Sequence, residues 1–114
     1  MVQYSQARKL DAVLAAISDP TRRAIIDRLA GGPERVSDVA QHFPMSLTGF
    51  CKHVRVLETA GLVRRTRHGR ENTLQLSPQP LREVSRWLSF YEKFWNSRLD
   101  QLEQFFAHNK EKSR

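Results

Sequence analysis

The sequence contains almost no cysteine and no long apolar run, and each shortage excludes a class of protein. Cys51 is the only cysteine among the 114 residues, so no disulfide can form within one chain. No apolar stretch approaches the roughly 20 residues that a membrane helix needs, and residues 1–9 lack the apolar centre of a signal peptide. We therefore expect a cytoplasmic protein that does not act at a membrane. In such a protein Cys51 is typically a small apolar residue, with redox sensing as the alternative.

Acidic residues are also scarce relative to basic ones. Nineteen Lys and Arg outnumber twelve Asp and Glu, which gives a formal net charge of +7. Between positions 52 and 70, six basic residues accompany the single acid Glu58, so this stretch carries +5 of the total. A concentrated basic patch is the electrostatic footprint of nucleic-acid binding, with a merely solvated surface as the alternative. The six residues are Lys52, Arg55, Arg64, Arg65, Arg67 and Arg70.

The residue groupings that indicate catalysis are missing as well. We find no nucleophile beside a base, no glycine-rich phosphate loop and no carboxylate pair that could share a cleft. The segment 31–33, Gly-Gly-Pro, is too short and too close to a helix end to cradle a nucleotide. A length of 114 residues without internal repeats favours one domain. We predict a protein that is not an enzyme and has no bound cofactor.

Two helices are predicted before residue 34. Apolar residues recur at helical spacing over about residues 8–18 and indicate the first helix. Ser18 or Asp19 can cap the second helix, and Pro20 suits its first position because a proline there loses no hydrogen bond. The segment 31–33 ends the second helix. The apolar residues of the two helices are Leu10, Val13, Leu14, Ile17, Ile25, Ile26 and Leu29.

The next two helices form a helix-turn-helix pattern. A short third helix is predicted to begin with Ser37 as its N-cap and to end at Pro44. The fourth is predicted over residues 46–60, with Ser46 as its N-cap and Gly61 as a left-handed stop. Two short helices joined by a tight turn are typical of DNA-binding proteins, in which the second helix enters the major groove.

A β-hairpin is predicted over residues 62–76. Segments 62–67 and 72–76 have the character of short strands, and residues 68–71 form the turn, in which Gly69 can adopt a positive φ. A hairpin alone is marginal in water, so this one is expected to pack on the helices. The predicted fold class is mostly α with a small β-hairpin, in the order α-α-α-α-β-β-α.

A long last helix is predicted over about residues 80–107. Its apolar residues follow one another at steps of three or four and form a continuous stripe. At roughly 1.5 Å per residue such a helix is about 40 Å long, more than a core of four short helices can cover. The surplus aromatic surface calls for a second chain, with a small-molecule pocket as the alternative. The stripe is Leu81, Val84, Leu88, Tyr91, Trp95, Leu99, Leu102 and Phe106, widened by Trp87, Phe90, Phe94 and Phe105.

The fourth helix divides into an inner and an outer face when it is drawn on a helical wheel. The inner face, predicted to anchor the core, is Leu47, Phe50, Val54 and Leu57. The outer face is Thr48, Gly49, Lys52, Val56 and Thr59, with Arg55 beside it. Small residues let this face approach a groove closely, and Lys52 and Arg55 can reach guanine edges or phosphates. A solvated face is the alternative for Thr48 and Lys52.

Residues beside these faces have more than one possible role. Ser46 can cap the helix, contact phosphate, or do both, because a helix start presents free N–H groups and a partial positive charge. His53 lies at the edge of the inner face and can touch phosphate or hydrogen-bond locally. In the hairpin, Arg65 and Arg67 share one strand face and Arg70 lies at or beside the tip. We assign these arginines mainly to positioning on the DNA backbone or in the minor groove.

Residues 46–63 resemble the recognition helix of ArsR-type winged helix-turn-helix repressors. The resemblance covers about residues 8–106. It departs from the family pattern at Cys51, where the family usually carries a Ser hydroxyl, and at the less usual Gly49 and Phe50. The closest matches are Lys52-His53, Val56-Leu57 and Ala60-Gly61-Leu62-Val63, together with Asp19-Pro20-Thr21-Arg22-Arg23 and Ile25 at the second-helix opening.

The resemblance implies a single winged-helix domain over residues 1–114 that represses transcription as a homodimer. The first and last helices, about 8–18 and 80–107, are expected to join two chains through Leu10, Leu14, Leu88, Tyr91, Trp95, Leu99 and Leu102. Two helices 46–60 are then expected in successive major grooves of a pseudo-palindromic operator, with hairpin 62–76 on the backbone or in the minor groove. A non-specific or RNA-binding winged-helix module is the alternative function.

Metal sensing, the best-known function of this family, is not expected. The family's metal sites use a Cys-x-Cys type motif in the third helix, or Asp, His and Glu ligands on the last helix. Here residues 37–40 contain no thiolate, and the last helix has no His before His108. His42, His53 and His68 lie on different predicted elements without ligand spacing. The aromatic last helix resembles a non-metal-sensing subgroup, and the sequence does not indicate a small-molecule effector.

Overall fold

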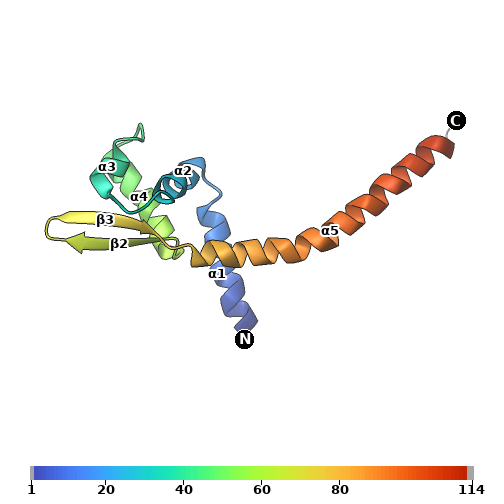
Figure 1. The fold of residues 1–114 in the computed structure, drawn as a ribbon, viewed down its shortest axis with the longest axis horizontal. Coiled ribbons are helices and arrows are strands. Elements are labelled where there is room, and N and C mark those ends of the chain that lie inside the picture. Colours follow the sequence, from blue (N-terminus) through green and yellow to red (C-terminus); the bar gives the residue numbers. More distant parts are fainter. Residues whose placement is uncertain (1, 113–114) are drawn as a thin grey trace. The chain divides into compact units, whose positions relative to one another are not determined.

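The computed structural model describes residues 2–112, and the side chains of residues 6–110. Its contacts group into two units, Met1–Val84 and Ser85–Arg114. The first unit holds the described strands, helices α1–α4 and the start of α5, and the second holds the rest of α5 (Figure 1). The elements are α1 (Val2–Ala16), α2 (Pro20–Leu29), β1 (Glu34–Arg35), α3 (Val36–Ala40), α4 (Leu47–Thr59), β2 (Val63–His68), β3 (Glu71–Leu76) and α5 (Gln79–Lys112).

The first helix, α1, begins and ends earlier than the predicted range of 8–18. It starts at Val2 because residues 6–9, Gln-Ala-Arg-Lys, are good helix formers that need no apolar face. It ends at Ala16, and the hydroxyl of Ser18 then donates to the carbonyl of Ala15 at 2.6 Å. That local hydrogen bond turns the chain toward α2.

The second helix has the start that the sequence predicts. Asp19 is the N-cap, because its carboxylate accepts the backbone N–H of Arg22 at 3.0 Å, and Pro20 is the first helical residue. The helix ends at Leu29, and Gly32 follows with a φ of +134°, which L side chains rarely adopt.

The prediction that Ser37 caps the third helix is wrong. α3 spans Val36–Ala40, and its N-cap is Arg35, which makes no capping hydrogen bond. Arg35 belongs to the two-residue strand β1 and pairs with Thr73 of β3. This pairing keeps the backbone extended up to the start of the helix. α3 also ends before the predicted stop at Pro44, and turns replace its expected last residues.

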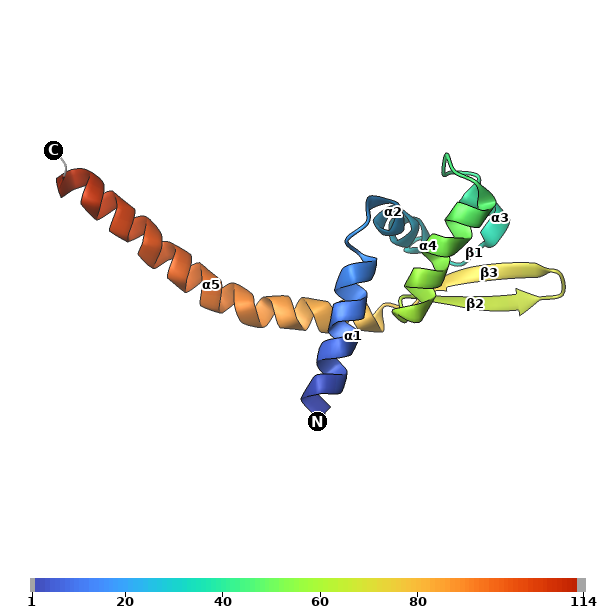
Figure 2. The ribbon, with the colours of Figure 1, turned by 180° about the vertical axis from the view of Figure 1, so that it is seen from behind.

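The described strands form one antiparallel sheet in the order β1-β3-β2, so the predicted hairpin gains a third strand that the sequence did not reveal. β2 and β3 pair from Val63 opposite Leu76 to the turn at Gly69. Gly69 has a φ of +62°, as predicted for this turn. Figure 2 shows that the tip of the β2–β3 hairpin extends past the helices of the first unit.

The core of the first unit fixes α4. Phe50, Val54 and Leu57 are completely buried, and burying each such side chain stabilises the fold by about 1.5–3 kcal/mol. Leu47 was predicted as a fourth anchor, and this prediction is wrong. Its side chain is 60% exposed because it is the first helical residue and no neighbouring element covers it. Other core residues are Val13, Ala16, Ile25, Ile26, Leu29, Val39, Leu62, Val63, Leu74 and Val84.

The last helix, α5, spans Gln79–Lys112, so its charged C-terminal end continues the helix past the predicted stop at about residue 107. From Ser85 to residue 110, the described side chains of its apolar stripe are exposed. Leu88, Trp95 and Leu99 are about half exposed, at 52%, 52% and 51%. No helix in the described part of the chain combines the length and apolar composition that a membrane span requires. An uncovered aromatic stripe of this kind marks an interaction surface.

Candidate nucleic-acid interface

The outer face of α4 is exposed and positively charged. Thr48, Lys52 and Arg55 are all exposed, as their predicted place on the wheel requires. Among residues 2–112, the side chains of Lys52 and Arg55 form no hydrogen bond or ion pair. Both cations are therefore available to a ligand outside the chain. Their helix is held from behind by its buried inner face, so their positions are fixed relative to the core.

The first turn of α4 is closed by Ser46. Its hydroxyl oxygen accepts the backbone N–H of Gly49 at 3.1 Å, which confirms the predicted cap. Because the oxygen acts as an acceptor in this bond, the hydroxyl proton stays available to donate to a phosphate. A Cβ at position 49 would lie 3.2 Å from the Ser46 hydroxyl oxygen, so a larger residue there would make that hydroxyl shift by a few tenths of an ångström.

The arginines of the β2–β3 hairpin differ in what holds them. Arg65 donates to the carboxylate of Glu58 on α4 at 2.9 Å, which ties the hairpin to the end of that helix. Arg67 donates through Nε to the carbonyl of Gly69 at 3.0 Å and so is folded back on the turn. Arg70, at the tip, is exposed and has no side-chain partner among residues 2–112. Arg70 is thus the most accessible cation of the three.

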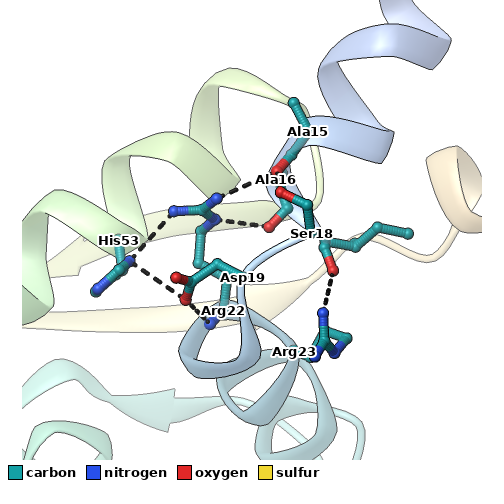
Figure 3. Close-up of polar contacts among 8 residues, drawn as sticks. Ala15, Ala16, Ser18, Asp19, Arg22, Arg23 and His53 are labelled. Carbon is teal, nitrogen blue, oxygen red and sulfur yellow. Dashed lines mark hydrogen bonds and ion pairs between the residues drawn. The ribbon is translucent and has the colours of Figure 1, made fainter.

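His53 takes part in a polar cluster that joins three helices (Figure 3). Its Nδ1 lies 3.3 Å from Nη1 of Arg22 and 3.8 Å from a carboxylate oxygen of Asp19. Arg22 also donates to the carbonyls of Ala16 at 2.6 Å and Ala15 at 3.1 Å. The contact with Arg22 is a hydrogen bond within the protein, and the alternative role of His53 in contacting phosphate stays a prediction. The cluster links the end of α1, the start of α2 and the middle of α4.

Arg22 is the residue of this cluster that sequence reasoning missed. The sequence places it three residues after the N-cap Asp19, but nothing in that spacing shows that its guanidinium reaches back to α1. The free carbonyls at the end of a helix attract a cation, which is a signal that could have identified it. Among residues 2–112, no three His, Cys, Asp or Glu side chains lie close enough together to hold a metal ion.

The pKa of the Asp19 carboxyl is lowered from its ordinary value. The largest cause is the hydrogen bond from the backbone N–H of Arg22, and the nearby charges of His53 and Arg22 lower it further. A carboxyl whose pKa is lower in the folded state stabilises the fold above its unfolded pKa, about 3.9. That contribution is lost as the pH falls through the lower folded-state pKa.

Replacing Asp19 with Asn is expected to lower stability at pH 7 and to change little in acid. Asn keeps the capping oxygen but removes the negative charge that His53 and Arg22 face. Urea unfolding of both proteins at pH 7, 5 and 3 measures the difference. The unfolding midpoint of the wild type should exceed that of the variant at pH 7, and the gap should close below about pH 4. A gap that stays constant across this range would show that the charge contributes nothing.

A helix-turn-helix followed by a β-hairpin, with an exposed basic face on the second helix, defines a winged helix-turn-helix DNA-binding protein. Comparison with known proteins agrees. The family described as "Helix-turn-helix domain" matches residues 17–66, which include α2, α3 and α4. The chain is 37% identical over 95 residues to the HTH-type transcriptional regulator Rv2034 of Mycobacterium tuberculosis, covering 83% of this chain and 86% of the relative. It is 35% identical over 85 residues to the transcriptional repressor SdpR of Bacillus subtilis, covering 74% and 94%.

Solved structures give the same answer. A crystal structure of an ArsR family transcriptional regulator aligns with a TM-score of 0.75 and 37% identity, over 80% of this chain and 94% of that one. The fold is shared by a homodimeric winged helix-turn-helix domain from Mycobacterium bovis, with a TM-score of 0.65 and 22% identity, over 80% and 85%. The chain belongs to the ArsR-type family of winged helix-turn-helix transcriptional regulators, as its resemblance implied.

Proposed function

We propose that this regulator is a dimeric repressor that reads a specific operator with the outer face of α4. The observation that carries the proposal is the pair of exposed cations Lys52 and Arg55, which have no side-chain partner among residues 2–112 and lie on a helix whose opposite side is buried in the core. Lys and Arg at such positions recognise guanine edges in the major groove. The proposed contacts from α4 are Ser46, Leu47, Thr48, Gly49, Lys52, His53 and Arg55.

The hairpin is proposed to position the protein on the duplex. Its cations are placed to contact the DNA backbone or the minor groove, which fixes orientation without reading sequence. Arg70 at the tip has the greatest freedom to do this. The charge of Arg65 is partly neutralised by its ion pair with Glu58, so we expect Arg65 to contribute less to DNA binding than Arg70 does. The proposed contacts from the hairpin are Arg65, Arg67 and Arg70.

A second copy of the chain is proposed to cover the stripe of α5. In the single chain, Trp95 and its neighbours along the stripe expose an aromatic surface to water. A second copy would remove this surface from water. The relative from Mycobacterium bovis is a homodimer, which supports this arrangement. Leu10 and Leu14 of α1 are partly buried against the core and offer only their remaining surface. The proposed interface residues are Leu10, Leu14, Leu88, Tyr91, Trp95, Leu99 and Leu102.

Duplex DNA is favoured over RNA as the ligand. The face of Thr48, Lys52 and Arg55 on a helix suits the wide major groove of B-DNA, whereas A-form RNA has a deep, narrow one. RNA-binding domains that read single strands stack bases on aromatic side chains. Among residues 6–110, the large exposed aromatic residues lie on α5 and not on α4 or the hairpin. The name of the relative SdpR, a transcriptional repressor, supports repression as the outcome of binding.

Titration with fragments of the protein's own promoter region tests this function. Specific binding is expected, and its affinity should fall about 10³-fold between 50 and 200 mM salt if a dimer makes about six phosphate contacts. Excess duplex RNA should not compete. A matched random duplex provides the control. Equal affinity for the promoter and the random duplex would leave only a non-specific module, and preference for RNA would favour the alternative function.

A further inference from the structure

One apolar side chain at the N-terminal end of α4 is neither buried in the core nor charged. Leu47 is 60% exposed, whereas Phe50, Val54 and Leu57 on the same helix are completely buried. An exposed leucine has no donor, acceptor or charge with which to contact phosphate. Its position is nevertheless well defined, because it directly follows the N-cap Ser46 and its backbone lies in the first turn of the helix.

The surroundings of Leu47 leave it open to a groove. Gly49 has no side chain, and the Ser46 hydroxyl oxygen is held back against the first turn by the backbone N–H of Gly49 at 3.1 Å. The first turn therefore presents the leucine beside Thr48, with no bulky neighbour on that turn other than the buried Phe50. In helix-turn-helix proteins the first residues of the recognition helix are the ones that contact base edges.

We propose that Leu47 reads the C5-methyl group of a pyrimidine in each half of the operator. The major groove offers an apolar side chain one apolar partner, the methyl group that thymine carries at C5. The methyl of 5-methylcytosine has the same chemistry and position. Leu47 thus specifies one base pair by apolar contact, while Lys52 and Arg55 supply the polar contacts. This inference rests on the proposed function, since it requires that α4 enters the major groove.

Val56 provides a matched comparison on the same helix. It is the other large apolar residue of α4 that is exposed, at 40%. It lies nine positions after Leu47, which is about 13 Å further along the helix axis. It is also on a different side of the helical wheel from Leu47. Val56 belongs to the outer face that is proposed to read the operator, so Val56→Ala is compared with Leu47→Ala only by its response to methyl loss at the base pair that Leu47 is proposed to contact. Val56 lies on the opposite side of the helix and should not touch that base pair.

The test begins with a duplex selected from a random library by the wild-type protein. Each thymine is then replaced singly by deoxyuridine, which removes only the C5-methyl group, and binding is measured for the wild type, Leu47→Ala and Val56→Ala. One thymine in each half-site should respond, with affinity for the wild type falling about four-fold per methyl group. Leu47→Ala should show no response at that thymine. Val56→Ala should show the wild-type fold-change at that thymine, whatever its overall affinity for the duplex.

Two further arms complete the experiment. Leu47→Met, which keeps an apolar side chain of similar reach, should retain the methyl response. Replacing the responsive thymine–adenine pair with cytosine–guanine, and then with 5-methylcytosine–guanine, distinguishes the two sources of the methyl group. The wild type should prefer the methylated form of the cytosine duplex, and Leu47→Ala should bind both forms equally. A response to thymine without any response to 5-methylcytosine would overturn the assignment to the C5-methyl group, because both bases carry it at the same position.

The outcomes separate this inference from the proposed function. If the wild type selects no sequence from the library, the proposed function fails and the inference fails with it. If the wild type selects a duplex but no thymine responds to loss of its methyl group, the inference alone is overturned. It is also overturned if Leu47→Ala, folded by circular dichroism, keeps the full wild-type response.

Discussion

Replacing Lys52 with Ala is expected to abolish specific operator binding while leaving the fold intact. Lys52 is exposed on the outer face of α4 and has no partner among residues 2–112, so its removal creates no cavity and breaks no internal bond. A good contact between a basic side chain and a base pair contributes about 1–3 kcal/mol of discrimination. A two-fold operator loses two such contacts, which corresponds to about 2–6 kcal/mol in total.

Titration of the selected duplex and of its scrambled form measures the effect, with thermal unfolding as the check on the fold. Lys93→Ala is the matched control, because it removes one exposed lysine outside the helix-turn-helix and the hairpin. The Lys93→Ala protein should bind almost as the wild type does. Operator affinity that survives Lys52→Ala would show that the outer face of α4 does not read the DNA.

Replacing Trp95 with Ala is expected to weaken the dimer by about 3–5 kcal/mol, the usual cost of deleting a buried aromatic side chain. Trp95 is 52% exposed in the single chain, where its ring contacts only Phe94 edge-on among the described aromatic rings, at 5.7 Å between centroids. The proposed second copy would bury the remaining surface. A cost of 3 kcal/mol alone corresponds to a rise of about 10²-fold in the dissociation constant. Because a two-fold interface contains the residue twice, the rise should be at least this large.

Sedimentation equilibrium over a range of protein concentrations measures that constant. The variant should dissociate at concentrations where the wild type and Lys93→Ala remain paired. Its helix content should be unchanged in circular dichroism, because the residue belongs to no core of the single chain. An unchanged sedimentation profile would contradict the assignment of the α5 stripe to the dimer interface.

The recognition helix could be predicted closely from sequence because its signals are local. Ser46 caps α4 through a residue three positions away, and Gly61 ends it with a φ of +77° that favours glycine. The turn at Gly69 is equally local. Phe50, Val54 and Leu57 follow the helical period that the core requires, and all three are buried.

The features that sequence reasoning missed depend on contacts between distant segments. β1 is only two residues long and exists because Glu34 and Arg35 pair with β3, almost forty positions later. That pairing also moved the start of α3 away from Ser37. The exposure of Leu47 reflects where the core ends, which helical periodicity does not reveal. The guanidinium of Arg22 bonds carbonyls of α1 and the ring of His53. The free carbonyls at a helix end are a signal for the first contact, but no pattern near Arg22 specifies His53, which lies 31 positions later.

Hydroxyl-radical footprinting of the selected duplex tests the central claim most directly, since it reports both the operator and the symmetry of the protein on it. A pair of chains that places two α4 helices in successive major grooves should protect two half-sites related by two-fold symmetry, with centres about one helical turn, 34–36 Å, apart. Lys52→Ala should erase both protected regions together. A single protected half-site, or even protection along the whole duplex, would contradict a symmetric pair of chains reading a specific operator.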